Sequence, residues 1–563
     1  MTTDDHNKVG TDLLEKGEYD EAISEFTKAI DGMLPDFADV HYKRSLAYYR
    51  KGEYDLAITD ATRAIEANPR HMEAYYSRGI AYLRKERFDM AISDLSNALK
   101  FNPSYTEAYY FRGIAYRNQK EYEMAIIDFD KAISLNPSYA EAYCHRSVAY
   151  RDKDEYDTVI ADATKAIQLN PDYAEAYYSR SIAYLKKDQY ELAMADFNRA
   201  IELDPHSADG YRNRGVAYYE KGEHGKALSD LNRTIGLTRD DALAYYYRGL
   251  VYREKGEINK AIADMTRAIE IKPNYVEAYC DRGVTYQRKE QLELARADFS
   301  KAIELSPSYA EAYLNRGLTY HSEGNYDQAI IDLGRAIELN SDYTKAYHAH
   351  GTACYNVGKY DLAIDDFSHL IELKPEMAEA YYDRAIVYSL LEKHEQAVAD
   401  LDKAIELNPG LAVAHYARGL ARFNRQEYES AIVDLDQAIQ LDPGITEAYY
   451  RRGIAHRLKD KYDLAVADLS EVIKKKSKES KAYHDRGFTF YLKREYDLAI
   501  IDLTKAIELN PGSASSHYIR GLAYKGKRKF DLAVADFKKA VSFSKDPDAA
   551  LAAKQEIQNL GGY

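Results

Sequence analysis

The sequence has few of the residues that build disulfide frameworks or membrane spans. Its three cysteines, Cys144, Cys280 and Cys354, are far apart and form no CxxC pair. An odd number of scattered cysteines argues against disulfides and favours a reducing compartment. No run of about eighteen apolar residues occurs, so we expect no membrane span. Residues 1–10 are polar and lack the apolar core of a signal peptide, and we therefore expect a cytoplasmic protein.

An excess of positive charge is also missing. The 77 Lys and Arg residues are outnumbered by 92 Asp and Glu residues, which gives a net charge of −15. A general nucleic-acid binder needs basic surface to contact phosphates, so we expect no nucleic-acid partner. There is no phosphate-binding Gly-rich loop, no HExxH and no GxSxG. We therefore expect neither an enzyme nor a cofactor. Tryptophan is absent too, whereas tyrosine occurs 54 times.

What the chain has instead is internal repetition. A pattern of 34 residues recurs from Thr3 to Pro547, with one extra residue in its first copy. Such a period indicates a repeat array in which each unit buries its apolar face against its neighbours. We number the positions of a repeat from 1 to 34. The sixteen repeats begin at residues 3, 38, 72, 106, 140, 174, 208, 242, 276, 310, 344, 378, 412, 446, 480 and 514.

Each repeat is predicted to form two helices, at positions 1–14 and 16–30, because apolar residues recur there at spacings of three and four. Position 15 is Gly in six repeats, which suits a left-handed turn, and position 32 is Pro in eleven, beyond the end of the second helix. Positions 8, 20 and 27 are kept small. Small residues at fixed points let helix axes approach closely.

This pattern resembles the tetratricopeptide repeat: aromatic at position 4, small at 8, Tyr at 11, Ala at 20, Phe or Leu at 24 and Pro at 32. The resemblance implies an all-α fold, a right-handed superhelical solenoid of helix-turn-helix repeats over residues 3–547. Residues 548–563 are expected to form a capping helix and a short tail, with Asp546 as N-cap. Two departures are His at position 4 in four repeats and Arg at position 7 in fourteen.

The resemblance also implies a binding surface, because first helices in this family line the inner groove. Positions 5 and 12 are among those that meet a ligand. Tyrosine and arginine there would form a protein-binding groove; alternatively, the tyrosines only shield the helix pair. The candidate tyrosines at position 5 are Tyr42, Tyr76, Tyr110, Tyr178, Tyr246, Tyr382, Tyr416, Tyr450 and Tyr518, and the candidate arginines at position 12 are Arg117, Arg151, Arg253 and Arg457.

Two functions are consistent with this reading. The first is an interaction scaffold that binds protein or peptide segments in its groove. The alternative is an architectural protein that self-associates into larger assemblies. Family members that clamp the C-terminal carboxylate of chaperones use Lys at position 5 and Asn at position 9. No repeat here has either residue, so that mode is not expected.

Two clusters of residues have both a functional and an ordinary structural explanation. His348, His350 and Cys354 lie close together and could suggest a metal site, and His350 and Cys354 share a helix face with i, i+4 spacing. However, His350 and Cys354 occupy positions 7 and 11, where packing or pairing is expected rather than metal binding. Residues 446–547 hold 22 basic against 14 acidic residues. Their lysines either form a docking patch for an acidic partner or are solvated residues at helix ends.

An ion-pair ladder is predicted from position 7, which is basic in every repeat except the first, and position 23, which is always acidic. Because only the first repeat lacks an upstream neighbour, we expect the acid of one repeat to pair with the arginine of the next. The expected pairs are Asp94 with Arg112, Asp128 with Arg146 and Asp298 with Arg316.

The seventh repeat is predicted to form a weak joint with the eighth. It has Thr234 at a position usually occupied by Ala, and Gly236 within its second helix. Glycine costs about 1 kcal/mol relative to alanine in a helix. We expect amide hydrogen exchange to be faster here than in flanking repeats. Uniform protection across residues 208–275 and their neighbours would contradict this prediction.

Overall fold

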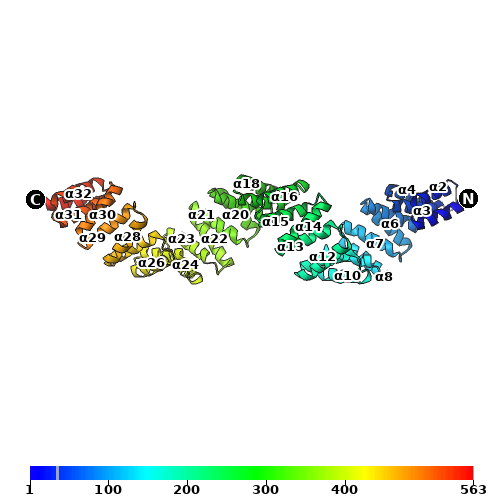
Figure 1. The fold of residues 1–563 in the computed structure, drawn as a ribbon, viewed down its shortest axis with the longest axis horizontal. Coiled ribbons are helices and arrows are strands. Elements are labelled where there is room, and N and C mark those ends of the chain that lie inside the picture. Colours follow the sequence, from blue (N-terminus) through cyan, green and yellow to red (C-terminus); the bar gives the residue numbers. More distant parts are fainter. Residues whose placement is uncertain (33–36, 562–563) are drawn as a thin grey trace. The chain divides into compact units, whose positions relative to one another are not determined.

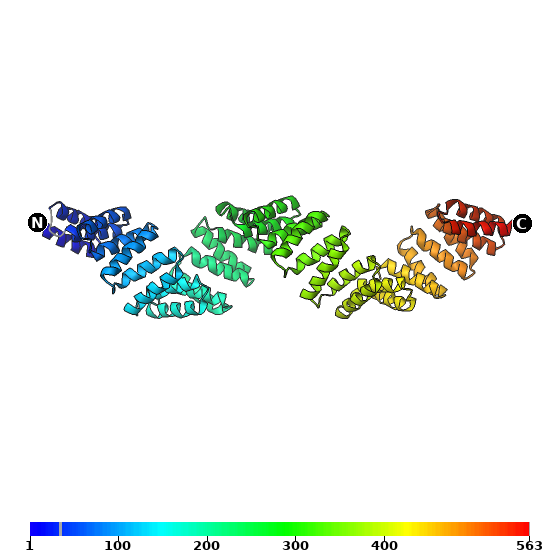
Figure 2. The ribbon, with the colours of Figure 1, turned by 180° about the vertical axis from the view of Figure 1, so that it is seen from behind.

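The computed structural model describes residues 1–32 and 37–561. In this part of the chain there are 33 α-helices and no strand, which confirms the all-α helix-pair fold. The chain divides into two compact units, Met1–Pro273 and Asn274–Tyr563. Within each unit, helices that are consecutive in sequence lie side by side (Figures 1 and 2).

The N-terminal unit contains eight helix pairs. Their first helices are α1 (Thr3–Lys16), α3 (Phe37–Lys51), α5 (Met72–Arg84), α7 (Thr106–Asn118), α9 (Ala140–Arg151), α11 (Ala174–Lys186), α13 (Ala208–Glu220) and α15 (Ala242–Glu254). Their second helices are α2 (Tyr19–Asp31), α4 (Tyr54–Ala67), α6 (Phe88–Phe101), α8 (Tyr122–Leu135), α10 (Tyr156–Leu169), α12 (Tyr190–Leu203), α14 (His224–Leu237) and α16 (Ile258–Ile271).

The C-terminal unit contains eight more pairs and one final helix. The first helices are α17 (Val276–Arg288), α19 (Ala310–Ser322), α21 (Thr344–Asn356), α23 (Ala378–Leu390), α25 (Ala412–Asn424), α27 (Thr446–Leu458), α29 (Ser480–Leu492) and α31 (Ala514–Gly526). The second helices are α18 (Leu292–Leu305), α20 (Tyr326–Leu339), α22 (Tyr360–Leu373), α24 (His394–Leu407), α26 (Tyr428–Leu441), α28 (Tyr462–Lys475), α30 (Tyr496–Leu509) and α32 (Phe530–Phe543).

The last helix, α33 (Pro547–Leu560), packs on α32. Asp546 caps its N-terminus by accepting a hydrogen bond from the Asp548 amide. Ile557 and Leu560 join the apolar cluster around Phe537, so α33 covers the exposed side of the last repeat. Residues 562 and 563, which the sequence assigns to a short tail, lie outside the described residues.

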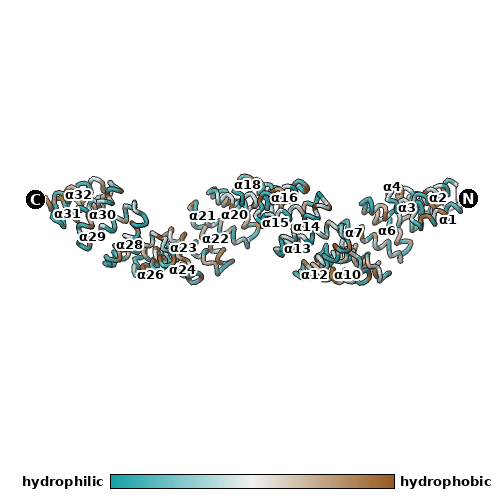
Figure 3. The backbone as a smooth tube through the Cα atoms, viewed as in Figure 1, coloured by the Kyte–Doolittle hydropathy of each residue, from teal (hydrophilic) through white to brown (hydrophobic). Residues whose placement is uncertain are grey.

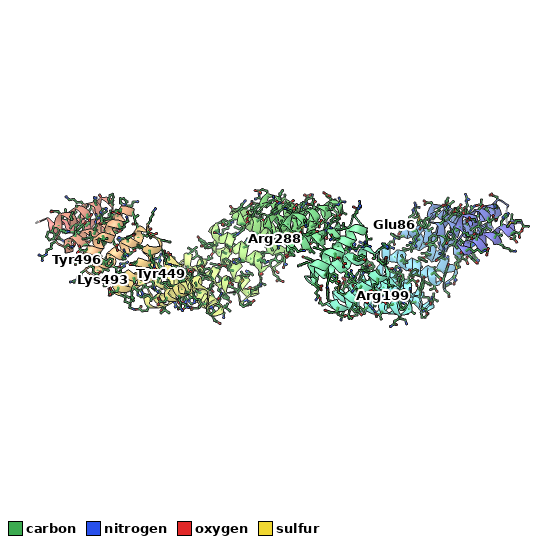
Figure 4. The ribbon with its side chains drawn as sticks, in the orientation of Figure 1. Glu86, Arg199, Arg288, Tyr449, Lys493 and Tyr496 are labelled. Carbon is green, nitrogen blue, oxygen red and sulfur yellow. The ribbon has the colours of Figure 1, made fainter. Side chains whose placement is uncertain are left out.

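Position 15 turns the chain between the two helices in the left-handed region of every repeat. The six glycines have φ between 75° and 87°, as the sequence predicted. The other ten repeats use ordinary side chains there, among them Glu86 at 57° and Lys120 at 64° (Figure 4 labels Glu86). Left-handed backbone costs a non-glycine residue about 1–2 kcal/mol. The turn is therefore imposed by packing of the helix pair and does not depend on glycine.

The core is built from small residues facing large ones. Position 20 is fully buried in all sixteen repeats, and position 24 is a buried apolar residue such as Phe129. A Cβ atom added to Gly113, at position 8, would lie 2.8 Å from the Phe129 ring, which explains why position 8 is small.

Hydrophobic and hydrophilic residues alternate along the helices (Figure 3). None of the described helices combines the length and apolar character that a membrane span requires.

The ion-pair ladder exists, but its predicted partners are wrong. Each position-7 arginine binds the position-23 aspartate of its own repeat, with shortest N–O distances of 2.5–2.7 Å. Arg112, for example, donates from Nε and Nη2 to both carboxylate oxygens of Asp128, not to Asp94. The two helices of a repeat run antiparallel, which sets positions 7 and 23 opposite each other.

The link to the preceding repeat uses a different residue, at position 25. Arg112 Nη1 donates to Ser96 Oγ at 2.9 Å, and Arg146 Nη1 donates to Asp130 at 2.5 Å. Position 25 is Ser, Thr, Asn or Asp in fourteen repeats, and arginine follows at position 7 of the next repeat in all fourteen. The first repeat has Val9 in place of the arginine. The sequence carries the signal for pairing between repeats at position 25, not at position 23.

Two aromatic rings hold the guanidinium in place. Arg112 lies 5.6 Å from the Tyr109 ring centre at position 4 and 5.9 Å from the Tyr116 ring at position 11. Arg452 lies 5.6 Å from the ring of Tyr449, which Figure 4 labels in α27. Such cation–π contacts contribute about 0.5–1 kcal/mol at partly exposed sites. The tyrosine-rich composition therefore serves the ladder as well as the apolar core.

A double-mutant cycle tests the corrected ladder. Combining Arg112→Met with Asp128→Asn should reveal a coupling free energy of about 1–3 kcal/mol, as expected for residues in direct contact. Combining Arg112→Met with Asp94→Asn should give less than about 0.5 kcal/mol. Native-state hydrogen exchange of α7 and α8 measures both coupling free energies. Global denaturation is unsuitable, because long repeat arrays do not unfold in two states. Equal coupling in the two cycles would refute pairing within the repeat.

Candidate functional site

All nine position-5 tyrosines lie on first helices and are buried or half-buried. Tyr110 is the most enclosed, with 8% of its surface exposed. Burial raises the pKa of the phenols at eight of these positions. The eight are Tyr42, Tyr76, Tyr110, Tyr178, Tyr382, Tyr416, Tyr450 and Tyr518. Tyr246 packs edge-on against Tyr247, with ring centres 5.3 Å apart.

These rings pack at the junction with the following repeat. Tyr76 lies 4.8 Å from the Tyr105 ring, at position 34, and 6.0 Å from the Phe111 ring, at position 6 of the next repeat. Tyr110 repeats this arrangement, 4.9 Å from Tyr139 and 5.4 Å from His145. These contacts are those expected if the tyrosines shield the helix pairs.

Two position-5 hydroxyls also bind position 6 of the next repeat directly. The Tyr178 hydroxyl accepts a hydrogen bond from the Asn213 amide. The Tyr450 hydroxyl donates to Asp485 Oδ2 at 2.6 Å. In these two repeats position 5 therefore joins consecutive first helices, in line with the alternative that the tyrosines have a packing role.

The position-12 arginines are half-buried and paired. Arg117 Nη1 lies 3.3 Å from His145 Nδ1, and Arg151 pairs with Asp152 at 3.6 Å. Arg253 pairs with Glu254 at 3.3 Å. Arg457 pairs with Asp485 at 3.4 Å and lies 4.8 Å from the Phe488 ring centre. Tyr450 and Arg457 thus both contact one carboxylate, that of Asp485.

Pockets recur at one place in the repeat, beside the N-terminal end of the first helix. Three are lined by a position-5 tyrosine together with residues at positions 1, 2 and 27 and the loop that follows the second helix. Tyr178 lines a pocket of about 250 Å³, Tyr450 one of about 430 Å³ and Tyr518 one of about 450 Å³. The sequence reading identified the tyrosines but missed the loop residues.

The three pockets differ in chemistry. The Tyr178 pocket is acidic, with Glu175, Asp204 and Asp209. The Tyr518 pocket is apolar, with Ala514, Ala540 and Phe543 in its lining.

The Tyr450 pocket holds Arg451, Lys476 and Lys481 alongside two glutamates. Arg451 pairs with Glu447 at 3.1 Å, whereas Lys476 and Lys481 form no ion pair within the described residues. Position 31 is Asn or Asp in nine repeats but Lys476 in this one. This departure is the sequence feature that could have identified the basic pocket.

Sequence profiles of the tetratricopeptide repeat match most of the chain, together over residues 9–95, 106–222, 249–445 and 480–547. The chain belongs to the tetratricopeptide repeat family. Residues 514–547, the last repeat, are among the matched segments. No curated protein matches the chain.

Several solved structures are similar to this tetratricopeptide repeat protein. A chain of the APC/C hetero-tetramer Cut9–Hcn1 is 17% identical, with a TM-score of 0.40 over 81% of this chain and 96% of that chain. YrrB, described as a TPR protein with an unusual peptide-binding site, is 25% identical, with a TM-score of 0.32 over 34% and 100%. MamA from Desulfovibrio magneticus RS-1 is 22% identical, with a TM-score of 0.29 over 30% and 96%.

The three cysteines should react slowly in the folded protein. Cys144, Cys280 and Cys354 are 0–2% exposed, and burial raises the pKa of the Cys144 thiol, which suppresses the reactive thiolate. We expect labelling by a disulfide reagent at least about 100-fold slower than in guanidinium, because it requires local opening. Three thiols should then react in denaturant. A thiol that reacts in the native protein at the denatured rate would contradict the described burial.

Proposed function

We propose that this chain is a protein-interaction scaffold whose recurring pockets hold side chains from segments of partner proteins. The observation that supports this proposal is the repetition of a pocket at the same place in the repeats of Tyr178, Tyr450 and Tyr518. Within one unit, a repeated pocket offers successive subsites, so several weak contacts can combine on one extended ligand. Repeat arrays commonly bind partners along such extended surfaces.

The position-5 tyrosines contribute one wall of each subsite. Tyrosine offers a large apolar face and keeps a hydroxyl for hydrogen bonding. Because the rings are already packed at the repeat junctions, they are pre-organised, and binding would cost little side-chain entropy. Specificity would come from the loop and helix-start residues, which differ from one pocket to the next.

The C-terminal unit contains two dissimilar pockets, around Tyr450 and Tyr518. Lys476 and Lys481 lack acidic partners within the described residues and would attract a carboxylate or phosphate. The Tyr518 pocket would accept an apolar side chain beside Phe543. We infer that this unit prefers a segment carrying both an acidic and an apolar residue.

Self-association is the second candidate, and one observation favours it. Exposed β-branched residues occupy position 22 on the second helices of four repeats. Ile127, Ile331, Val433 and Ile501 are each 58–66% exposed. They lie on separate helices, and two of them have a second exposed apolar residue one turn earlier, Met124 before Ile127 and Leu498 before Ile501. Small exposed apolar groups of this size are common on monomers. Light scattering distinguishes the two candidate functions, because a monomer at micromolar concentration would favour the scaffold over self-association.

Peptide display on the full chain tests the scaffold. Selected peptides should be rich in acidic residues and bind the unmodified protein. The double variant Lys476→Glu and Lys481→Glu should weaken their binding about tenfold or more, since it places two negative charges against a carboxylate. These lysines are exposed, so the fold should persist, whereas truncating a packed tyrosine would confound binding with stability.

Lys478→Glu is the matched control, because Lys478 lies in the same loop but does not line the pocket. It should change affinity less than about threefold, as expected for a charge at the rim of a site. If no peptide is selected, or if all three lysine changes weaken binding equally, the pocket is not the recognition site.

A further inference from the structure

One repeat departs from the ladder at three positions at once. In the repeat that begins at residue 344, position 7 is His350 and position 11 is Cys354, while position 25 of the preceding repeat is Gly334. Each of these residue types occurs only once at its position among the sixteen repeats. The position-23 acid, Asp366, is retained. The changes meet around one carboxylate.

These side chains place nitrogen, sulfur and oxygen atoms close together. His350 and Cys354 are separated by one turn of α21, and Asp366 faces them from α22. His350 Nδ1 lies 2.6 Å from Asp366 Oδ2 and 3.8 Å from Cys354 Sγ. The three atoms that could act as ligands all lie within 4.8 Å of one another. Cys354 and Asp366 are buried.

The space around these atoms differs from that in the other repeats. In the fourteen repeats with arginine at position 7, position 25 of the preceding repeat is a polar acceptor, and in all other repeats a bulky side chain, usually tyrosine, occupies position 11. Here Gly334 supplies no side chain, and a Cβ atom added to it would lie 3.5 Å from His350 Nε2. The imidazole keeps 13% of its side-chain surface exposed, which connects the cluster to solvent.

We propose that His350, Cys354 and Asp366 form a binding site for one divalent transition-metal ion of the Zn²⁺ class. Imidazole, thiolate and carboxylate together suit Zn²⁺ or Co²⁺, whereas Mg²⁺ and Ca²⁺ prefer oxygen ligands alone. Metal–ligand distances of about 2.0–2.3 Å place tetrahedral ligand atoms about 3.3–3.8 Å apart. The 3.8 Å separation of Cys354 Sγ and His350 Nδ1 already fits this range. The 2.6 Å separation of His350 Nδ1 and Asp366 Oδ2 would have to increase by less than 1 Å. Water would complete the tetrahedron.

The competing explanation is a plain ion pair that replaces arginine. Burial lowers the pKa of His350, but hydrogen bonds with Asp366 and Cys354 outweigh it and raise the pKa to about 9. A protonated imidazole would bind Asp366 while Cys354 remained a neutral thiol. The two explanations differ in whether the thiol becomes a thiolate ligand, and this difference defines the experiment.

Cobalt titration of the full chain, purified without metal and kept reduced, tests the site. Co²⁺ should bind at one equivalent and produce visible d–d bands together with a near-ultraviolet thiolate-to-cobalt band. Added Zn²⁺ should displace it and abolish the colour. Cys354→Ser should remove the charge-transfer band and weaken Zn²⁺ binding more than about 100-fold, because loss of a ligand exceeds the 10–100-fold loss of an outer-shell partner.

Two further variants keep the test decisive. Cys144→Ser, at another buried cysteine, should leave both bands unchanged. His350→Arg restores the ladder residue found in fourteen repeats, so it should fold yet fail to bind Co²⁺. Zn²⁺ should raise the midpoint of thermal unfolding of the unmodified chain but not of His350→Arg. Absence of a one-equivalent band, or a thiolate band that survives Cys354→Ser, overturns the proposal.

Discussion

The guanidinium at position 7 is the group on which the repeat array depends. It binds the aspartate of its own repeat through two nitrogens and an acceptor of the preceding repeat through the third, as in Arg112 with Asp128 and Ser96. One planar side chain thus fixes both the helix pair and its neighbour. The aspartates are nearly inaccessible to water, so a missing arginine would leave a buried, uncompensated charge. This penalty enforces register, even where the net stabilisation by each pair is small.

The proposed binding surface depends on this register. Position 5 of one repeat meets positions 34 and 6 around the next junction, as Tyr76 meets Tyr105 and Phe111 and as Tyr110 meets Tyr139 and His145. A pocket beside that junction can recur while its lining changes from acidic at Tyr178 to basic at Tyr450. Constant packing and a variable pocket lining therefore belong to different positions of one repeat.

The repeat of His350 illustrates how such a frame tolerates exceptions. This repeat lacks the arginine, and the preceding repeat lacks the polar acceptor because its position 25 is Gly334. No acceptor side chain at position 25 is therefore left without a partner. The aspartate keeps a partner in His350 at 2.6 Å, and Cys354 replaces the tyrosine that would cover the imidazole. The substitutions to Gly334, His350 and Cys354 thus surround the retained Asp366 and give this junction a set of side chains that differs from those of the other repeats.

The sequence by itself determined the period, the two helices of each repeat and the small residues at the close approaches, because these follow from local spacing and side-chain volume. It also indicated that positions 7 and 23 pair. Only the tertiary structure decided that Arg112 meets Asp128 and not Asp94, since both aspartates belong to adjacent second helices and only three-dimensional packing distinguishes them. Packing likewise decided that Tyr110 is enclosed at a junction, because burial of a ring depends on neighbours from other helices.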